Sequence, residues 1–231
     1  MEKIDSKFFP VDRVLETSLV AIDKVKLRKK VWFLFFKRLF DLVVGSIALF
    51  LVMPIILIVA LLIKLEEPKG PILFSQIRIG KDEKKFRLYK IRSMCVNAEE
   101  KLEKLAELNE VQGAMFKMKA DPRITRIGKV IRKLSIDELP QLWNVIKGDM
   151  SLIGPRPPLP REVSQYKESE LQRLLVKPGC TGLWQVSGRN NLGFDEMVNL
   201  DLSYIENLNV KNDLKIFFKT LKVLLFTNGA Y

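Results

Sequence analysis

The longest apolar stretch of the chain runs from Leu42 to Ile63, twenty-two residues without a charged side chain. At a rise of about 1.5 Å per residue, a helix of this length extends roughly 33 Å, which is enough to cross a bilayer. Pro54 lies near its middle, where a proline removes a backbone hydrogen bond and kinks a helix. The pattern therefore predicts a membrane helix over residues 37–64 that is broken at Pro54.

The charges that flank this stretch are balanced. Residues 24–38 and residues 64–87 carry seven Lys or Arg side chains each, so the excess of positive charge on cytoplasmic flanks gives no orientation. A segment that enters the bilayer, turns at Pro54 and returns to the same leaflet would place both flanks in the cytoplasm. We therefore predict a re-entrant helix, with a spanning helix as the alternative.

Shorter patterns predict the rest of the fold. Residues 1–36 form a basic amphipathic N-terminal segment, within which residues 11–36 suit a helix on an anionic membrane surface or an ordinary packed helix. The further elements expected are a β-hairpin over 72–79 and 86–92, helices over 96–110, 162–175 and 194–226, and a rigid proline-rich loop over 154–160. We expect an α+β, mostly helical, monotopic membrane protein with one cytoplasmic catalytic domain over residues 65–231.

Composition narrows the chemistry. The chain has 39 Lys and Arg against 27 Asp and Glu, a net charge of +12, and no His. The commonest general base is therefore absent, and no zinc or haem site is expected. The two cysteines, Cys95 and Cys180, suit reduced cytoplasmic thiols. A basic chain also suits nucleic acid, but the long apolar stretch and the absence of a recognised binding motif oppose that class. A non-catalytic membrane scaffold is the other alternative.

Two adjacent carboxylates, Asp137 and Glu138, follow a strongly basic stretch over residues 117–133. Positive charge of this density suits a phosphate-bearing substrate. An ionised Asp is already an anion at neutral pH and needs no base to attack phosphorus. The same oxygens could instead hold Mg²⁺ beside a diphosphate.

The local sequence also allows a structural explanation of the pair. Ser135 and Glu138 match the S-x-x-E capping box, which would make Glu138 part of a helix start. Pro140 opposes that arrangement and could itself begin the helix. In either case the carboxylates are expected at a helix N-terminus.

Several motifs, in one consistent order over residues 37–231, resemble those of the bacterial sugar transferase family, the monotopic polyprenyl-phosphate phosphoglycosyl transferases. The matching segments are Lys37-Arg38-Leu-Phe-Asp41, Lys90-Ile-Arg92, Arg132-Lys-Leu-Ser-Ile-Asp-Glu-Leu-Pro-Gln141, Gly148-Asp-Met-Ser-Leu-Ile-Gly-Pro-Arg-Pro157, Lys177-Pro-Gly179 and Gln185-Val-Ser-Gly-Arg-Asn190. The closing Gly229-Ala230-Tyr231 resembles the hexose-1-phosphate transferase branch.

The resemblance implies a function. Members transfer a sugar-1-phosphate from a UDP-sugar to polyprenyl (undecaprenyl) phosphate, release UMP and so start exopolysaccharide or lipopolysaccharide assembly. It also implies a re-entrant helix and a catalytic domain on the cytoplasmic face of the bacterial inner membrane, and it admits a homodimer. The motifs do not specify the sugar.

The same resemblance assigns site residues. Asp137 would be the nucleophile that forms a covalent phosphoglycosyl intermediate, and Asp137 and Glu138 would both lie by Mg²⁺. The family positions associated with phosphate or nucleotide binding are Lys90, Arg132, Arg156, Pro157 and Arg189. Asp201 and Asp213 match acidic positions of the family in its C-terminal region. For two of these site residues a plainer explanation stays open: Lys90 could belong to a solvated strand face, and Asp213 could cap the last helix.

Overall fold

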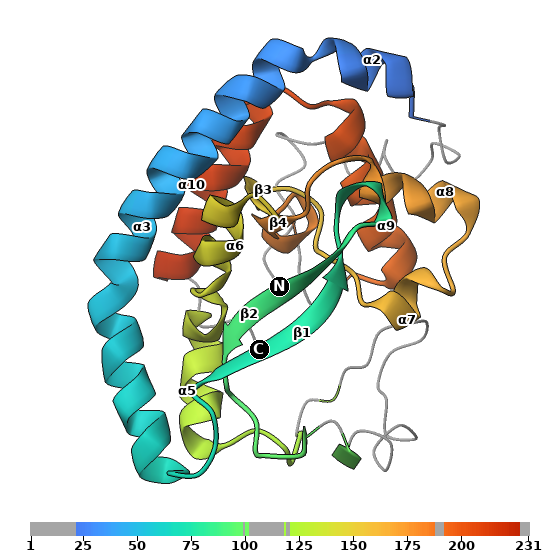
Figure 1. Cartoon of the computed structure of the whole chain (residues 1–231). Helices are drawn as coiled ribbons and strands as arrows, with labels where there is room; N and C mark the ends of the chain where they lie inside the picture. Colours follow the sequence, from blue (N-terminus) through green and yellow to red (C-terminus); the bar gives the residue numbers. More distant parts are fainter. Residues whose placement is uncertain (1–21, 99, 102–117, 119–120, 188–191, 227–231) are drawn as a thin grey trace.

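The computed structural model describes residues 22–98, 100–101, 118, 121–187 and 192–226. Within this part of the chain the fold is mostly helical, and one helix, α3 (Val31–Glu66), extends along one side of the molecule (Figure 1). The short helix α2 (Lys24–Lys29) precedes it. Residues 11–21 of the helix predicted over 11–36, and most of the helix predicted over 96–110, lie outside the described residues. Residues 22–36 are described and contain α2 and the start of α3 instead of one helix.

Helix α3 is one continuous helix through Pro54, so the helix is not interrupted at this residue, and Figure 1 shows that it bends along its length. The re-entrant arrangement stays a prediction. A proline removes only its own backbone donor and strains one carbonyl a turn earlier. The hydrogen bonds on both sides of Pro54 maintain the helix, as they do in many proline-containing membrane helices. The helix also begins six residues earlier than predicted, at Val31.

Both ends of α3 pack on the same domain. Near its start, the buried Asp41 carboxylate accepts hydrogen bonds from the Leu152 amide at 2.9 Å and from the Ser151 hydroxyl at 3.1 Å. Near its end, Val59 and Ile63 are buried in a small apolar cluster that includes strand and helix residues of the domain. The helix therefore lies along the domain instead of projecting away from it.

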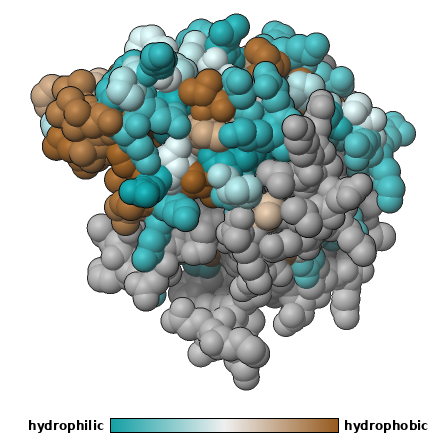
Figure 2. All heavy atoms as spheres, turned by 90° about the horizontal axis from the view of Figure 1, so that it is seen from below, coloured by the Kyte–Doolittle hydropathy of each residue, from teal (hydrophilic) through white to brown (hydrophobic). Residues whose placement is uncertain are grey.

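The opposite side of α3 is an exposed apolar face. Its large exposed side chains are Val43, Ile47, Phe50, Leu51, Leu57, Ile58, Leu61 and Leu65, with Trp32, Phe35, Phe36 and Leu39 in the first turns. In Figure 2 the apolar side chains gather at the edge of the molecule where α3 lies. A continuous apolar surface of this size is typical of contact with a membrane or a partner. Among the described residues, α3 alone is long and apolar enough to cross a bilayer, and this is compatible with membrane association.

The predicted β-hairpin is confirmed. Strands β1 (Leu73–Ile79) and β2 (Lys85–Ile91) pair antiparallel, with Gln76 opposite Leu88. The connecting turn, η1 (Lys81–Glu83), contains positive φ angles at Asp82 and Glu83. Phe86, Leu88 and Lys90 lie on one face of β2, because they are two residues apart. The face that packs Phe86 and Leu88 into the core therefore also carries Lys90 to the site described below.

A second, smaller sheet escaped sequence analysis. Strands β3 (Ser151–Ile153) and β4 (Gly179–Thr181) pair in parallel, with three residues each. Runs this short show no alternation that a sequence pattern could detect. Their backbones come so close that a Cβ atom on Gly179 would lie 2.1 Å from the Gly154 nitrogen, so this position requires glycine.

The other elements are short helices, and most bounds differ from those predicted. They are α5 (Arg126–Lys133), η3 (Ile136–Glu138), α6 (Gln141–Lys147), α7 (Pro160–Val163), α8 (Glu168–Leu171), η4 (Gln172–Leu175), η5 (Trp184–Val186), α9 (Phe194–Glu206) and α10 (Val210–Phe226). The single helix predicted over 194–226 is two helices, because the Asn209 side chain accepts from the Asn212 amide and starts α10 anew. Of the proline-rich loop predicted over 154–160, residues 154–159 form no helix or strand, while Pro160 begins α7.

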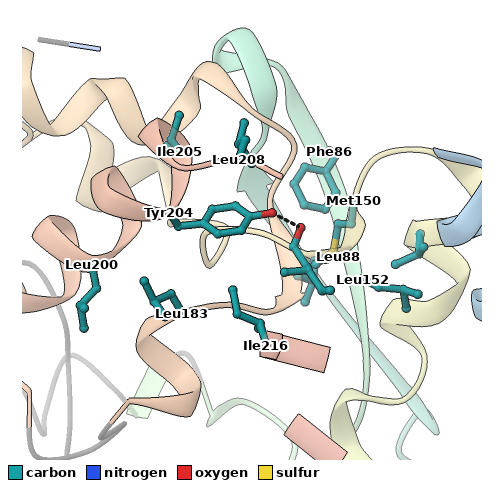
Figure 3. Close-up of a cluster of buried hydrophobic side chains, with 12 residues drawn as sticks. Phe86, Leu88, Met150, Leu152, Leu183, Leu200, Tyr204, Ile205, Leu208 and Ile216 are labelled. Carbon is teal, nitrogen blue, oxygen red and sulfur yellow. Dashed lines mark hydrogen bonds between the residues drawn. The ribbon is translucent and has the colours of Figure 1, made fainter. Parts of the chain in front are cut away.

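The main core lies between the hairpin, the small sheet and the last two helices. Figure 3 shows its buried side chains, among them Leu88, Met150, Leu183 and Ile216. The Tyr204 hydroxyl donates to the Ile153 carbonyl at 3.2 Å, the bond drawn in that figure. In this way α9 is joined to β3, and the core supports the segment that carries the proline-rich loop.

Candidate active site

The Asp137-Glu138 pair lies in the 3-10 turn η3, between α5 and α6. Ser135 adopts a left-handed conformation with φ of 56° and its side chain makes no capping hydrogen bond, so the capping-box alternative does not form. Helix α6 begins at Gln141, directly after Pro140. The carboxylates are therefore presented by a tight turn ahead of α6, close to the alternative that places the helix start at Pro140.

Asp137 is buried, with 7% of its surface exposed. Burial raises the pKa of its carboxyl to about 6, with a further rise from the neighbouring Glu138, while the positive charges of Lys90 and Arg132 oppose the rise. A carboxylate in this environment is desolvated and still largely ionised at pH 7.5. Those are the properties of an activated oxygen nucleophile.

Glu138 is paired with Lys90 from the hairpin. Lys90 Nζ donates to Glu138 Oε1 at 2.7 Å, and the two side chains are 21% and 40% exposed. The structure therefore places Lys90 at the dyad and not on a merely solvated strand face. Arg132 lies in the last turn of α5, near enough for its charge to act on Asp137.

The proline-rich loop approaches the same site through Arg78, a residue that sequence analysis did not select. Arg78 on β1 is 7% exposed and donates from Nη1 to the Pro157 carbonyl at 2.9 Å. Burial and the adjacent positive charge of Arg156 lower the pKa of Arg78 to about 10, while Glu138 acts in the opposite direction. Arg78, Arg156 and Glu138 thus share one electrostatic environment.

Asn144 on α6 attaches the helix to the hairpin, and it too was missed. It is fully buried, accepts from the Tyr89 amide at 3.1 Å and donates to the Arg87 carbonyl at 2.8 Å. Lys90 is the next residue of β2, so these bonds hold the lysine at the level of the dyad. The sequence signal that could have identified Asn144 is a polar side chain at an apolar position of an amphipathic helix. A buried amide there must hydrogen-bond to another part of the chain.

Two predicted acidic residues are bonded to other groups. Asp201 is 1% exposed and accepts from Arg173 Nε at 2.9 Å and Nη2 at 2.7 Å. Asp213 pairs with Lys37 at 2.7 Å and accepts from the Tyr204 hydroxyl at 2.9 Å. Their contacts connect helices, and the structure does not bring either to the dyad. Asp213 does not cap α10, since Asn209 does so, and Arg189 lies outside the described residues.

The dyad could hold one divalent cation with help from its substrate. The described part of the chain contains no group of three or more acidic, Cys or His side chains suited to a metal. Mg²⁺ commonly binds through one or two carboxylates together with substrate phosphates. The oxygens of Asp137 and the partly exposed Glu138 match that donor set.

These features define a class of protein. The buried Asp137 lies beside the partly exposed Glu138 and close to Lys90 and Arg132, and Arg156 adds positive charge next to Arg78. This arrangement suits phosphoryl chemistry, and the exposed face of α3 is compatible with membrane association. The chain matches the model of the family described as bacterial sugar transferase over residues 32–227. It belongs to that family.

Named relatives agree with this assignment. The chain is 50% identical over 190 residues to galactosyl transferase CpsE of Streptococcus agalactiae, covering 82% of this chain and 40% of that protein. It is 45% identical over 201 residues to undecaprenyl-phosphate galactose phosphotransferase of Salmonella typhimurium, covering 85% of this chain and 42% of that protein. It is 39% identical over 199 residues to exopolysaccharide production protein ExoY of Rhizobium meliloti, covering 84% of this chain and 88% of that protein. The chain therefore spans less than half of the first two relatives and most of the third.

Proposed function

We propose that this protein transfers a sugar-1-phosphate from a UDP-sugar to polyprenyl phosphate and releases UMP, the initiating step of a lipid-linked polysaccharide. The observation that carries the proposal is the buried Asp137 beside Glu138, Lys90 and Arg132. The names of the relatives support the reaction class, and two of them specify galactose. UDP-galactose is therefore the first donor to test.

The proposed reaction consists of two displacements. In the first, an Asp137 carboxylate oxygen attacks the sugar-linked phosphorus, an aspartyl–phosphorus bond forms, and the bond to UMP breaks. In the second, a phosphate oxygen of the polyprenyl acceptor attacks the same phosphorus and frees Asp137. Neither step needs a general base, which suits a chain without histidine.

The surrounding cations have distinct parts in this scheme. Lys90 and Arg132 face the dyad, so they would neutralise charge on the transferring phosphoryl group. Arg156, held in a backbone bounded by prolines, would bind phosphate in a bidentate manner. Asp137 and Glu138 would hold Mg²⁺, which supplies further charge neutralisation at the diphosphate when bound.

We further propose that the domain lies on the cytoplasmic face of the inner membrane, with α3 as its membrane element. Both ends of α3 pack on one domain, and this supports placing both flanks on the same side of the bilayer. A helix that crossed the membrane completely would pull one of those packed ends away from its contacts. A re-entrant or shallow position preserves both.

The decisive experiment mixes the protein with UDP-galactose in the absence of any polyprenyl phosphate. Covalent catalysis predicts UMP release equal to the number of active sites, with the sugar-phosphate retained on the peptide that contains Asp137 after denaturation. Asp137→Asn should lose both signals. Glu168→Gln, an exposed acid-to-amide change in α8, is the matched control and should retain both.

Two results would contradict the proposal at different levels. UMP release only when polyprenyl phosphate is present, with no labelled peptide, would exclude the covalent intermediate but keep the transferase. No UMP from UDP-galactose, UDP-glucose or UDP-N-acetylgalactosamine with acceptor present would favour a non-catalytic scaffold.

A further inference from the structure

A cavity of about 610 Å³ lies away from the dyad, among the start of α3, the turn η1 and the segment after η4. Arg38 lines it and donates to the carbonyls of Val145 and Ile146 at the C-terminal end of α6. Asp137 precedes the opposite end of that helix. The seven residues of α6 span about 10 Å, so the cavity and the dyad are separate places.

The polar side of the cavity carries an excess of positive charge. Lys37, Arg38, Lys81 and Lys177 line it, against Asp41 and Asp82. Two of these cations are already bonded: Lys37 to Asp213, and Arg38 to the carbonyls of α6. Lys177 makes no hydrogen bond or ion pair within the described part of the chain.

Lys177 is held close to a second cation. A Cβ atom placed on Gly148 would lie 3.2 Å from Arg38 Nη2 and 3.6 Å from Lys177 Nζ, so both groups converge on one point. Burial and the charge of Arg38 lower the pKa of Lys177, and the carboxylates of Asp41 and Asp149 only partly oppose this change. An anion in the cavity would relieve this repulsion and give the ammonium group a partner.

The other side of the cavity is apolar and continues to the surface. It is lined by Leu27, Leu34, Leu175, Val176 and Leu208. Leu34 is 39% exposed and neighbours the exposed Phe35 on α3. An occupant with a charged head and an apolar tail could therefore lie with its head at Lys177 and its tail toward the apolar face of α3.

We propose that this cavity binds the phosphate headgroup of an anionic membrane lipid, with Lys177 as the main contact, at a site distinct from the catalytic one. The acceptor is not the expected occupant, because its phosphate must reach phosphorus at Asp137, beyond the far end of α6. The proposal rests on the membrane position of α3 and on no step of the transfer reaction. Such a site would set the depth and orientation of the domain on the bilayer.

The test uses the full chain in phosphatidylcholine-like detergent micelles, titrated with phosphatidylglycerol while the thermal unfolding midpoint is followed. Binding to the folded state raises the midpoint, and the titration yields an apparent Kd. Lys177→Met keeps the aliphatic stem and removes the charge. Loss of one charge-assisted hydrogen bond should weaken binding about tenfold. Lys177→Arg should retain it.

Lys167→Met is the matched control, because this exposed lysine precedes α8 and does not line the cavity. It should bind phosphatidylglycerol like the wild type. Equal affinity of Lys177→Met and Lys167→Met would overturn the site. An equal rise of the midpoint with inorganic phosphate alone, lost in Lys177→Met, would overturn the lipid as occupant in favour of a free anion. None of these measurements depends on UMP release, so their outcome is independent of the transferase proposal.

Discussion

Replacing Asp137 with Asn should stabilise the protein at neutral pH while it abolishes the proposed chemistry. Asp137 is buried beside Glu138, and this environment raises the pKa of its carboxyl from 3.8 to about 6. The folded state therefore holds its proton more tightly than the unfolded state, and ionisation above pH 6 costs stability. Asparagine keeps the shape of the side chain and has no charge to desolvate.

The size of the effect follows from the two pKa values. A difference of about two pH units corresponds to about 3 kcal/mol, at about 1.4 kcal/mol per unit. This figure is an upper value, because Asn also loses attraction to Lys90 and Arg132. We expect a gain of about 2 kcal/mol in the free energy of unfolding at pH 7.5, or about 4–8 °C in Tm for a chain of this size.

The pH dependence identifies the cause. Between pH 6 and pH 4 the wild-type carboxyl takes up its proton in the folded state before it does so in the unfolded state. The contribution of this carboxyl to the free energy of unfolding of the wild type therefore rises as the pH falls through that window. The difference in free energy of unfolding between Asp137→Asn and the wild type should shrink toward pH 4. Thermal unfolding of both proteins in detergent, at pH values from 4 to 8, measures this directly.

Asp201→Asn is the informative contrast. Burial also raises the pKa of Asp201 to about 6, but its carboxylate is bonded to the fully buried Arg173. Removal of that charge leaves a buried guanidinium without a counter-ion, so this variant should lose about 3–5 kcal/mol. A destabilised Asp137→Asn, or an advantage that does not change with pH, would refute the assignment of Asp137 as a desolvated and weakly compensated carboxylate.

Two further predictions concern the site. Removal of divalent cations with EDTA should abolish turnover, and added Mg²⁺ should restore it, as measured by UMP release; unchanged turnover would exclude a metal held by Asp137 and Glu138. Arg156→Lys should lower kcat/KM at least tenfold although it keeps the charge, because an ammonium group cannot reproduce a bidentate guanidinium contact; full activity would reduce Arg156 to long-range attraction.

Local patterns were enough to predict several elements. The alternation of side chains over residues 72–79 and 86–92 predicted the hairpin, and the charge-free run from Leu42 predicted the long apolar helix α3. Both signals come from neighbours in the chain. The same method predicted one helix over 194–226, because helical periodicity continues on both sides of Asn209. Periodicity does not reveal that the Asn209 side chain caps the start of a second helix.

For the site, too, the sequence established some features and the tertiary structure decided the others. The sequence by itself determined that Asp137 and Glu138 are adjacent, that histidine is absent, and that cations are abundant. Only the tertiary structure decided which cations reach the dyad. Lys90 meets Glu138 across 48 positions of sequence, and Arg78 meets the Pro157 carbonyl across 79. Sequence patterns report periodicity among near neighbours, whereas these contacts depend on how the hairpin, α6 and the proline-rich loop pack together. For the same reason packing decided that Asp201 is a buried partner of Arg173, and that Lys177 lines a cavity with no ion pair to any of the described residues.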